Sequence, residues 1–249
     1  MRPMRNDIAG KVAVITEAAS APGKAIARHL SEEGASLVLG ARDIAGLKEL
    51  VDELVWDGGK VLMLETDMTE SPQAARLVAA AADEFGRVDV MVNNPVPLPE
   101  LAFRDGGIGD VELIAGIHML CIVHGVVAAL PYLRRGRGHI INVAPFAVPG
   151  SGADNARAAA IGHALRRASE GLREQVIPYG IRTTLVAPGL ALSEAGTELG
   201  QGTPRFHHCV SMQAASVARA VAFAIRQPDD LDIKVQARSF ADRHERQPA

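Results

Sequence analysis

Two side chains have the right type to act as acid–base catalysts, although neither lies in a recognisable catalytic motif. His118 carries an imidazole, which titrates near neutral pH and can give or take a proton. Asp154 opens a predicted helix and could supply a carboxylate at the sheet edge where α/β proteins bind ligands. A lone histidine on a helix is more often packed or solvated than catalytic. We therefore predict for His118 and Asp154 no more than the role of substitute acid–base groups.

A second group of residues has the side chains of a metal site but the wrong spacing. Residues 207–209 read His-His-Cys. Adjacent histidines rarely reach the same ion, and no second cluster supplies matching ligands. We expect an ordinary loop here and no metal.

The elements that position these residues alternate regularly along the chain. Strands are predicted from short apolar runs at residues 11–16, 36–40, 60–65, 88–92, 138–143 and 181–186, with a short edge strand at 231–235. Helices are predicted at 23–34, 43–56, 71–85, 109–135, 154–178 and 214–226. Such alternation predicts βαβ units and one doubly wound parallel sheet, a Rossmann-like α/β fold. We expect a single domain over residues 1–249, with a flexible tail at 242–249.

The composition excludes several classes of function. The chain has 249 residues, 48% of them hydrophobic, and a net charge of −3. That charge argues against nucleic acid as a partner. The sequence also lacks a run of 18 apolar residues, so we expect no membrane span. Two cysteines and a polar start without a signal peptide indicate a reducing, cytoplasmic setting.

Four segments are similar to the short-chain dehydrogenase/reductase family. They read AGKVAVIT at 9–16, DVMVNN at 89–94, GHIINVA at 138–144 and YGIRTTLVAPG at 179–189. The resemblance extends over residues 9–236. It implies a dinucleotide-binding fold that transfers hydride to or from NAD or NADP.

The cofactor loop departs from the family pattern. Family members read Thr-Gly-x-x-x-Gly-x-Gly, whereas residues 16–23 here read TEAASAPG and keep only the last glycine, Gly23. Glu17 would place a carboxylate beside the pyrophosphate, Ala21 adds a methyl group, and Pro22 removes an N–H donor. These changes predict a closed or repurposed site. The alternative is that Glu17 points to solvent and the loop still binds a nucleotide.

Other cofactor positions of the family are kept in part. The resemblance assigns residual cofactor contacts to Gly23, Arg42, Asp67, Asn93, Pro188, Gly189 and Ser193. Arg42 matches a basic position that receives the 2′-phosphate of NADP, and Asp67 matches an aspartate that meets adenine. Both also have ordinary interpretations, as a solvated arginine and a loop-capping aspartate.

All four catalytic positions of the family are replaced. The resemblance places its serine at Pro145, its tyrosine at Ala158, its lysine at Gly162 and its asparagine at His118. Alanine and glycine have no proton to give, and proline has no donor. We therefore expect no hydride chemistry of the family type.

The resemblance implies a role in assembly. We expect a catalytically silent subunit that pairs with an active short-chain dehydrogenase/reductase subunit, which could act on a hydroxyacyl-CoA. The two long helices, 109–135 and 154–178, would form the contact, and a homo-oligomer is the other assembly. No cofactor is expected. Two alternatives stay open: a non-redox enzyme (a dehydratase, lyase or cyclase), or a divergent oxidoreductase that binds NADP or NAD.

Overall fold

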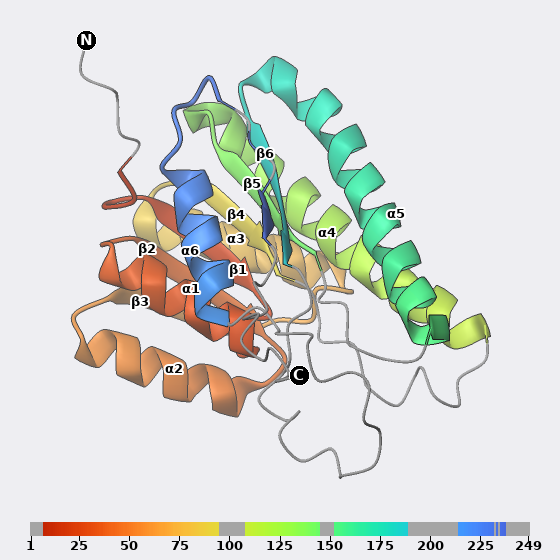
Figure 1. The fold of residues 1–249 in the computed structure, drawn as a ribbon. Helices are drawn as coiled ribbons and strands as arrows, with labels where there is room; N and C mark the ends of the chain where they lie inside the picture. Colours follow the sequence, from red (N-terminus) through yellow and green to blue (C-terminus); the bar gives the residue numbers. More distant parts are fainter. Residues whose placement is uncertain are drawn as a thin grey trace, which may run out of the picture.

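One seven-stranded parallel sheet organises the computed structural model, which describes residues 7–94, 108–144, 152–188, 214–231, 233 and 235–237. The strand order is β3-β2-β1-β4-β5-β6-β7. The strands are β1 (Val12–Thr16), β2 (Ser36–Ala41), β3 (Lys60–Glu65), β4 (Val90–Asn93), β5 (His139–Val143), β6 (Arg182–Pro188) and β7 (Val235–Ala237). The order changes direction at β1 and β4, whose carboxyl ends form the switch point where such sheets bind ligands (Figure 1).

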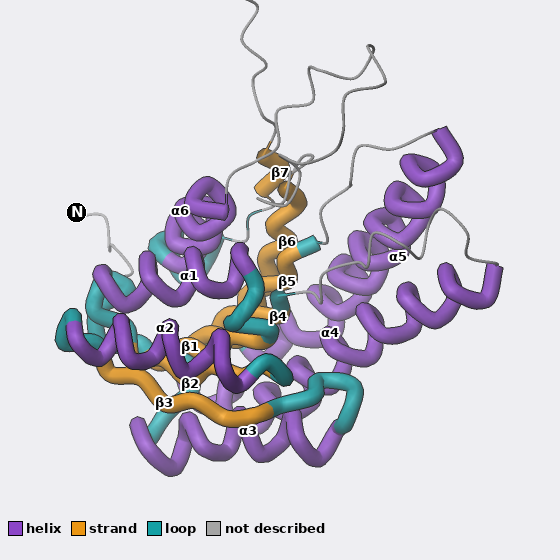
Figure 2. Tube along the Cα trace, turned by 90° about the horizontal axis from the view of Figure 1, so that it is seen from below, coloured by secondary structure: helices purple, strands orange, loops and turns teal. Residues whose placement is uncertain are grey.

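Helices cover both faces of the sheet. They are α1 (Ala21–Glu32), α2 (Ile44–Trp56), α3 (Ser71–Phe85), α4 (Ile108–Gly136), α5 (Gly152–Val176) and α6 (Ala214–Ile225). The helices α1, α2 and α6 lie on one side of the strands, and α3, α4 and α5 lie on the other (Figure 2). Each layer forms its own apolar cluster with one face of the sheet. Burial on both faces explains why the strand sequences are nearly all apolar.

The predicted fold is confirmed, and the element boundaries differ by only a few residues. The edge strand begins at Val235, not at 231, because the chain first makes a turn in which Leu231 N donates to Pro228 O. The helix predicted at 154–178 ends as an α-helix at Val176 and closes with a 3-10 turn, Ile177–Tyr179. Pro178 cannot donate an N–H, and Gly180 takes a left-handed φ of 69°, so the α-helix ends there. The tail at 242–249 lies outside the described residues.

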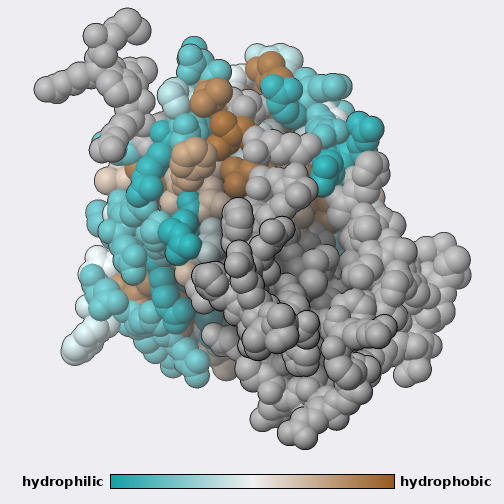
Figure 3. All heavy atoms as spheres, viewed as in Figure 1, coloured by the Kyte–Doolittle hydropathy of each residue, from teal (hydrophilic) through white to brown (hydrophobic). Residues whose placement is uncertain are grey.

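Helix α4 includes an unusually apolar segment. Residues Gly116–Gly136 are long and apolar enough to cross a membrane, judged by length and composition alone. In this fold the inner face of the segment packs against α3 and the sheet, as a core helix does. On the face seen in Figure 3, hydrophilic residues cover most of the described surface around α1 and α2.

Candidate cofactor and active site

Hydrogen bonds hold the loop after β1 against the end of β4. The Thr16 hydroxyl accepts from the backbone N–H of Asn94 at 3.0 Å and lies 3.1 Å from its carbonyl oxygen. The Asn94 side-chain amide donates to Glu17 O at 3.1 Å and to Ser20 Oγ at 2.9 Å. Ser20 Oγ in turn donates to Glu17 O at 2.7 Å. The loop is therefore fixed at the switch point of the sheet by its own side chains.

The start of α1 has few N–H groups left for an anion. Ser20 is the N-cap, and its hydroxyl accepts from Gly23 N at 3.2 Å. Pro22 has no N–H. Of the first three residues of α1, only Ala21 keeps an N–H without a bond inside the described part of the chain. A helix start binds a phosphate through several such donors, so this one is poorly suited to a pyrophosphate.

Gly23 is needed for packing whether or not a nucleotide binds. A Cβ at this position would overlap the carbonyl oxygen of Glu17 and the backbone of Ala18. The retention of this glycine therefore reflects the close approach of α1 to the loop.

Glu17 is buried at the mouth of the site. Glu17 is only 9% exposed, and its backbone adopts a left-handed φ of 46°. The glycine of the family pattern adopts that conformation freely, whereas a residue with a Cβ adopts it at a cost in conformational free energy. Burial raises the pKa of the Glu17 carboxyl, the charge of Arg42 acts against this rise, and Asp67 adds to it. The expectation that the Glu17 side chain points to solvent, which was one half of the alternative, is therefore wrong.

Arg42 and Asp67 lie near enough to Glu17 for their charges to act on it. Arg42 is exposed just after β2, and its charge acts on both carboxylates. Asp67 Oδ1 accepts from Thr69 N at 2.9 Å and from Thr69 Oγ1 at 2.7 Å. Burial pushes the pKa of Asp67 up, but the two bonds from Thr69 and the charge of Arg42 together outweigh it, and the net shift is downward. One oxygen of this carboxylate is thus occupied within its own turn.

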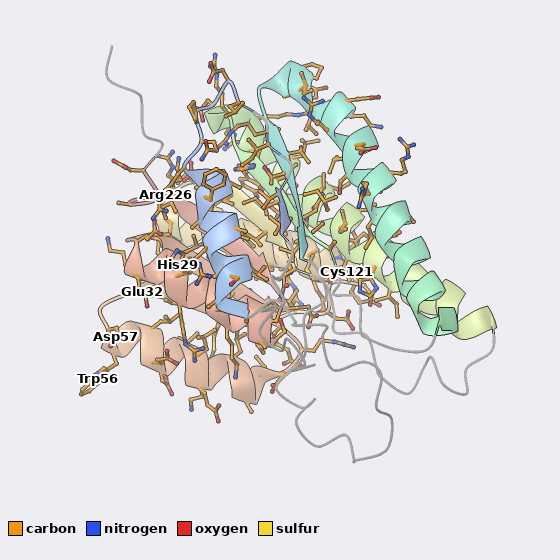
Figure 4. The ribbon with its side chains drawn as sticks, in the orientation of Figure 1. His29, Glu32, Trp56, Asp57, Cys121 and Arg226 are labelled. Atoms are coloured by element: carbon orange, nitrogen blue, oxygen red, sulfur yellow. The ribbon has the colours of Figure 1, made fainter. Side chains whose placement is uncertain are left out.

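Helix α4 brings a thiol to the same site. His118 and Cys121 are both buried on α4, at 3% and 6% exposure. Burial, followed by the charges of Glu17 and Asp67, raises the pKa of the Cys121 thiol to about 12. Figure 4 shows Cys121 near the carboxyl ends of the strands. Cys121 follows His118 by about one turn of α4, but no pattern in the sequence connects Cys121 with Glu17.

Asn93 holds the sheet together. Its side-chain amide donates to Asn142 Oδ1 at 2.8 Å, and the amide of Asn142 donates to Ser169 Oγ at 3.0 Å. This buried chain of bonds joins β4, β5 and α5. The Asn93 amide nitrogen is therefore committed to the framework, which is an ordinary reason for an asparagine here.

The replaced catalytic positions on α5 share one face of the helix. Asp154, Ala158 and Gly162 follow one another at intervals of four residues within Gly152–Val176. The tyrosine and lysine positions of the family thus carry a methyl group and a hydrogen atom. Pro188 is the last residue of β6. Pro145, Gly189 and Ser193 lie outside the described residues, as does the His-His-Cys run at 207–209.

Metal ligands do not gather at this site. Within the ranges that the structure covers, no group of three or more His, Cys, Asp or Glu side chains could hold a metal ion.

Comparisons with known proteins agree with this architecture. The profile of the family described as short chain dehydrogenase matches residues 11–204. An uncharacterized oxidoreductase of Staphylococcus saprophyticus is 30% identical over 240 residues, covering 92% of this chain and 95% of its own. A metagenomic short-chain oxidoreductase solved in complex with NADP is 27% identical, with a TM-score of 0.73 and coverage of 93% and 98%. An alcohol dehydrogenase from Thermococcus sibiricus complexed with 5-hydroxy-NADP, at 23% identity and a TM-score of 0.75 over 94% and 99% of the chains, shows the shared fold.

Proposed function

The chain belongs to the short-chain dehydrogenase family, and we propose that it is a catalytically silent member that assembles with an active dehydrogenase subunit. The observation that carries the proposal is the loop after β1. There a buried Glu17 carboxyl replaces the flexible glycine, and Pro22 removes a phosphate donor. The replaced positions Ala158 and Gly162 on α5 support the same conclusion, since neither can move a proton.

The surface of α4 supports the assembly half of the proposal. Leu120, Val123 and Val127 are 45%, 46% and 62% exposed, and their spacing puts them along one side of the helix. Ile117 and Cys121 on the same helix pack inward, whereas Val123 lies on the outer face. An apolar strip of this kind suits a second long helix from a partner subunit.

The partner in this proposal is an active short-chain dehydrogenase, and a hydroxyacyl-CoA is the substrate class we propose for the pair. Heteromers that resemble such a pair join one working and one degenerate subunit, as in hydroxy(phenyl)methyl-succinyl-CoA dehydrogenase. In that arrangement this chain supplies α4 and α5 to the contact, and the partner supplies the cofactor and the proton-transfer groups.

Co-purification from the native source tests the proposal. The tagged wild-type chain should retain a second short-chain dehydrogenase in near-equal amount, together with an NAD(P)-dependent activity. Val127→Glu, which puts a charge on the exposed strip, should lose both. The matched control is Val55→Glu on α2, where another exposed valine (52%) lies away from α4. Recovery of the wild-type chain only as a homo-oligomer would overturn the proposal.

A divergent NADP-dependent oxidoreductase is the second candidate. The relative solved with NADP and the position of Arg42 beside the loop favour it. In that case Arg42→Ala should weaken NADPH binding far more than NADH binding, because only NADPH carries the 2′-phosphate. Equal effects on both cofactors, or no binding at all, would exclude this role for Arg42.

A further inference from the structure

A cavity lies at the opposite edge of the sheet from the candidate cofactor site. It opens at the amino ends of β5 and β6, beside the turn after α6, and has a volume of about 220 Å³. This is smaller than the roughly 300–1,000 Å³ of pockets that hold drug-sized ligands. The cavity therefore suits a small ion or group.

Basic side chains outnumber acidic ones around this cavity. Its charged lining comprises Lys11, Arg87, Arg137, Arg182, Asp89 and Asp229. Four cations thus face two carboxylates, which leaves a net positive site.

The carboxylate of Asp89 is fully engaged. Arg87 donates to it with both arms of its guanidinium, at 2.8 Å and 2.6 Å, and Val12 N donates at 2.9 Å. Asp89 therefore balances the charge of Arg87 and does not neutralise the other cations of the cavity.

Arg182 is held at the end of α6. Its two terminal nitrogens donate to the carbonyl oxygens of Ala224 and Ile225 at 3.1 Å and 3.2 Å, and Asp229 lies 3.9 Å from its Nε. Lys11 and Arg137, by contrast, make no salt bridge with any residue in the described segments. Two cations at the cavity are thus available for an anion.

A buried histidine completes the lining. His139 is only 2% exposed, and its Nε2 lies 2.8 Å from the Thr184 hydroxyl. Its other nitrogen, Nδ1, has no hydrogen-bond partner among the residues that the structure covers. Burial, then the charges of Arg182 and Lys11, lowers the pKa of His139 well below its usual range. The ring is therefore neutral, with one N–H to donate.

We propose that this cavity binds a small oxyanion of the phosphate type. The Thr184 hydroxyl donates to Nε2 of His139, which places the ring proton on the buried Nδ1, so the neutral ring lies in the lining as a reporter of the bound anion. Lys11 and Arg137 supply the balancing charge, and the field of Arg182 adds to it. The bound anion links the starts of β1, β5 and β6, at the opposite edge of the sheet from the loop after β1.

Calorimetric titration with inorganic phosphate tests the proposal, with chloride holding the ionic strength constant and acetate as a second arm. The wild-type chain should show saturable heat with phosphate, weaker heat with acetate, and an unfolding midpoint that rises to a plateau. The double variant Lys11→Met/Arg137→Met should bind phosphate at least tenfold more weakly. The charge-matched control, Lys48→Met/Arg76→Met on α2 and α3, should bind as the wild type does.

Two results would overturn the proposal. One is a phosphate effect of equal size in Lys11→Met/Arg137→Met, which would mark a general salt effect. The other is the absence of saturable heat in the wild-type chain. The NMR signal of His139 Nδ1 gives a reading that does not depend on stability. It should move saturably with phosphate, and a signal that stays fixed would also contradict the assignment.

Discussion

The carbonyl oxygen of Glu17 lies against Gly23, so closely that a Cβ on Gly23 would overlap it. The same oxygen accepts bonds from Ser20 Oγ and from the Asn94 amide. The loop that would receive a dinucleotide is thus packed and hydrogen-bonded without one. Its single remaining glycine serves the framework of the fold.

Gly23→Ala tests this packing. The added methyl group meets backbone atoms of Glu17 and Ala18, so the substitution should lower the free energy of unfolding by about 1–3 kcal/mol. Gly171→Ala on α5 is the matched control, because a Cβ there meets nothing within 4 Å. The control should be neutral or stabilising by up to about 1 kcal/mol. Urea unfolding measures both, and equal stabilities would show that the loop is open at Gly23.

Glu17→Gln tests the burial of the carboxyl. An acid whose pKa rises on folding holds its proton more tightly in the folded state than in the unfolded chain. Glu17 therefore costs stability as the pH rises from its ordinary value of 4.5 through the raised folded-state pKa. Glu17→Gln, measured by urea unfolding from about pH 4 to pH 8, should gain stability over the wild type across that window and keep a constant advantage above it.

Glu53 provides a control of opposite sign for that experiment. The hydrogen bond from Arg28 lowers the pKa of this exposed carboxyl. Glu53→Gln should therefore lose a little stability at neutral pH, and that deficit should fade as the pH falls through the lowered pKa. If Glu17→Gln follows the Glu53→Gln pattern, Glu17 is not desolvated.

Cys121 should be chemically silent in the folded chain. Its thiol is buried, and its pKa of about 12 leaves almost no thiolate at about pH 8. In a Cys209→Ser background, iodoacetamide should label Cys121 far more slowly in the native protein than in urea. Mass spectrometry of the peptide that contains Cys121 follows the reaction. Labelling at the rate of a free cysteine would place the thiol on an open surface.

Sequence patterns were sufficient for the framework because local signals agreed with the tertiary fold. Asp43 caps α2 through Gly46 N, and Ser71–Phe85 forms α3 as predicted. The edge strand β7 was misplaced, since three residues that pair with β6 carry little periodicity of their own.

The site was less predictable because its character depends on residues distant in sequence. The sequence shows a glutamate at position 17, but its burial depends on the packing around it. The pKa of its carboxyl also depends on the charges of Arg42 and Asp67. Likewise, nothing in the spacing of Cys121 reveals that Glu17 and Asp67 raise the pKa of its thiol. No sequence motif indicates His139 or the cavity at the amino ends of the strands.

Restoring the family loop should create a cofactor site. The triple variant Glu17→Gly/Ala21→Gly/Pro22→Ile removes the buried carboxyl and returns an N–H to the start of α1. We expect it to bind NADPH at least tenfold more tightly than the wild-type chain, measured by the fluorescence of the cofactor. No gain would mean that other parts of the chain close the site.

The most direct test of the central claim is the same fluorescence titration of the wild-type chain with NADPH and with NADH. Because the loop after β1 is packed and hydrogen-bonded closed, we expect no saturable signal with either cofactor up to about 1 mM, which corresponds to a free energy of binding weaker than about −4 kcal/mol. Saturable binding with a micromolar Kd would contradict it and would identify the chain as a cofactor-binding oxidoreductase in its own right.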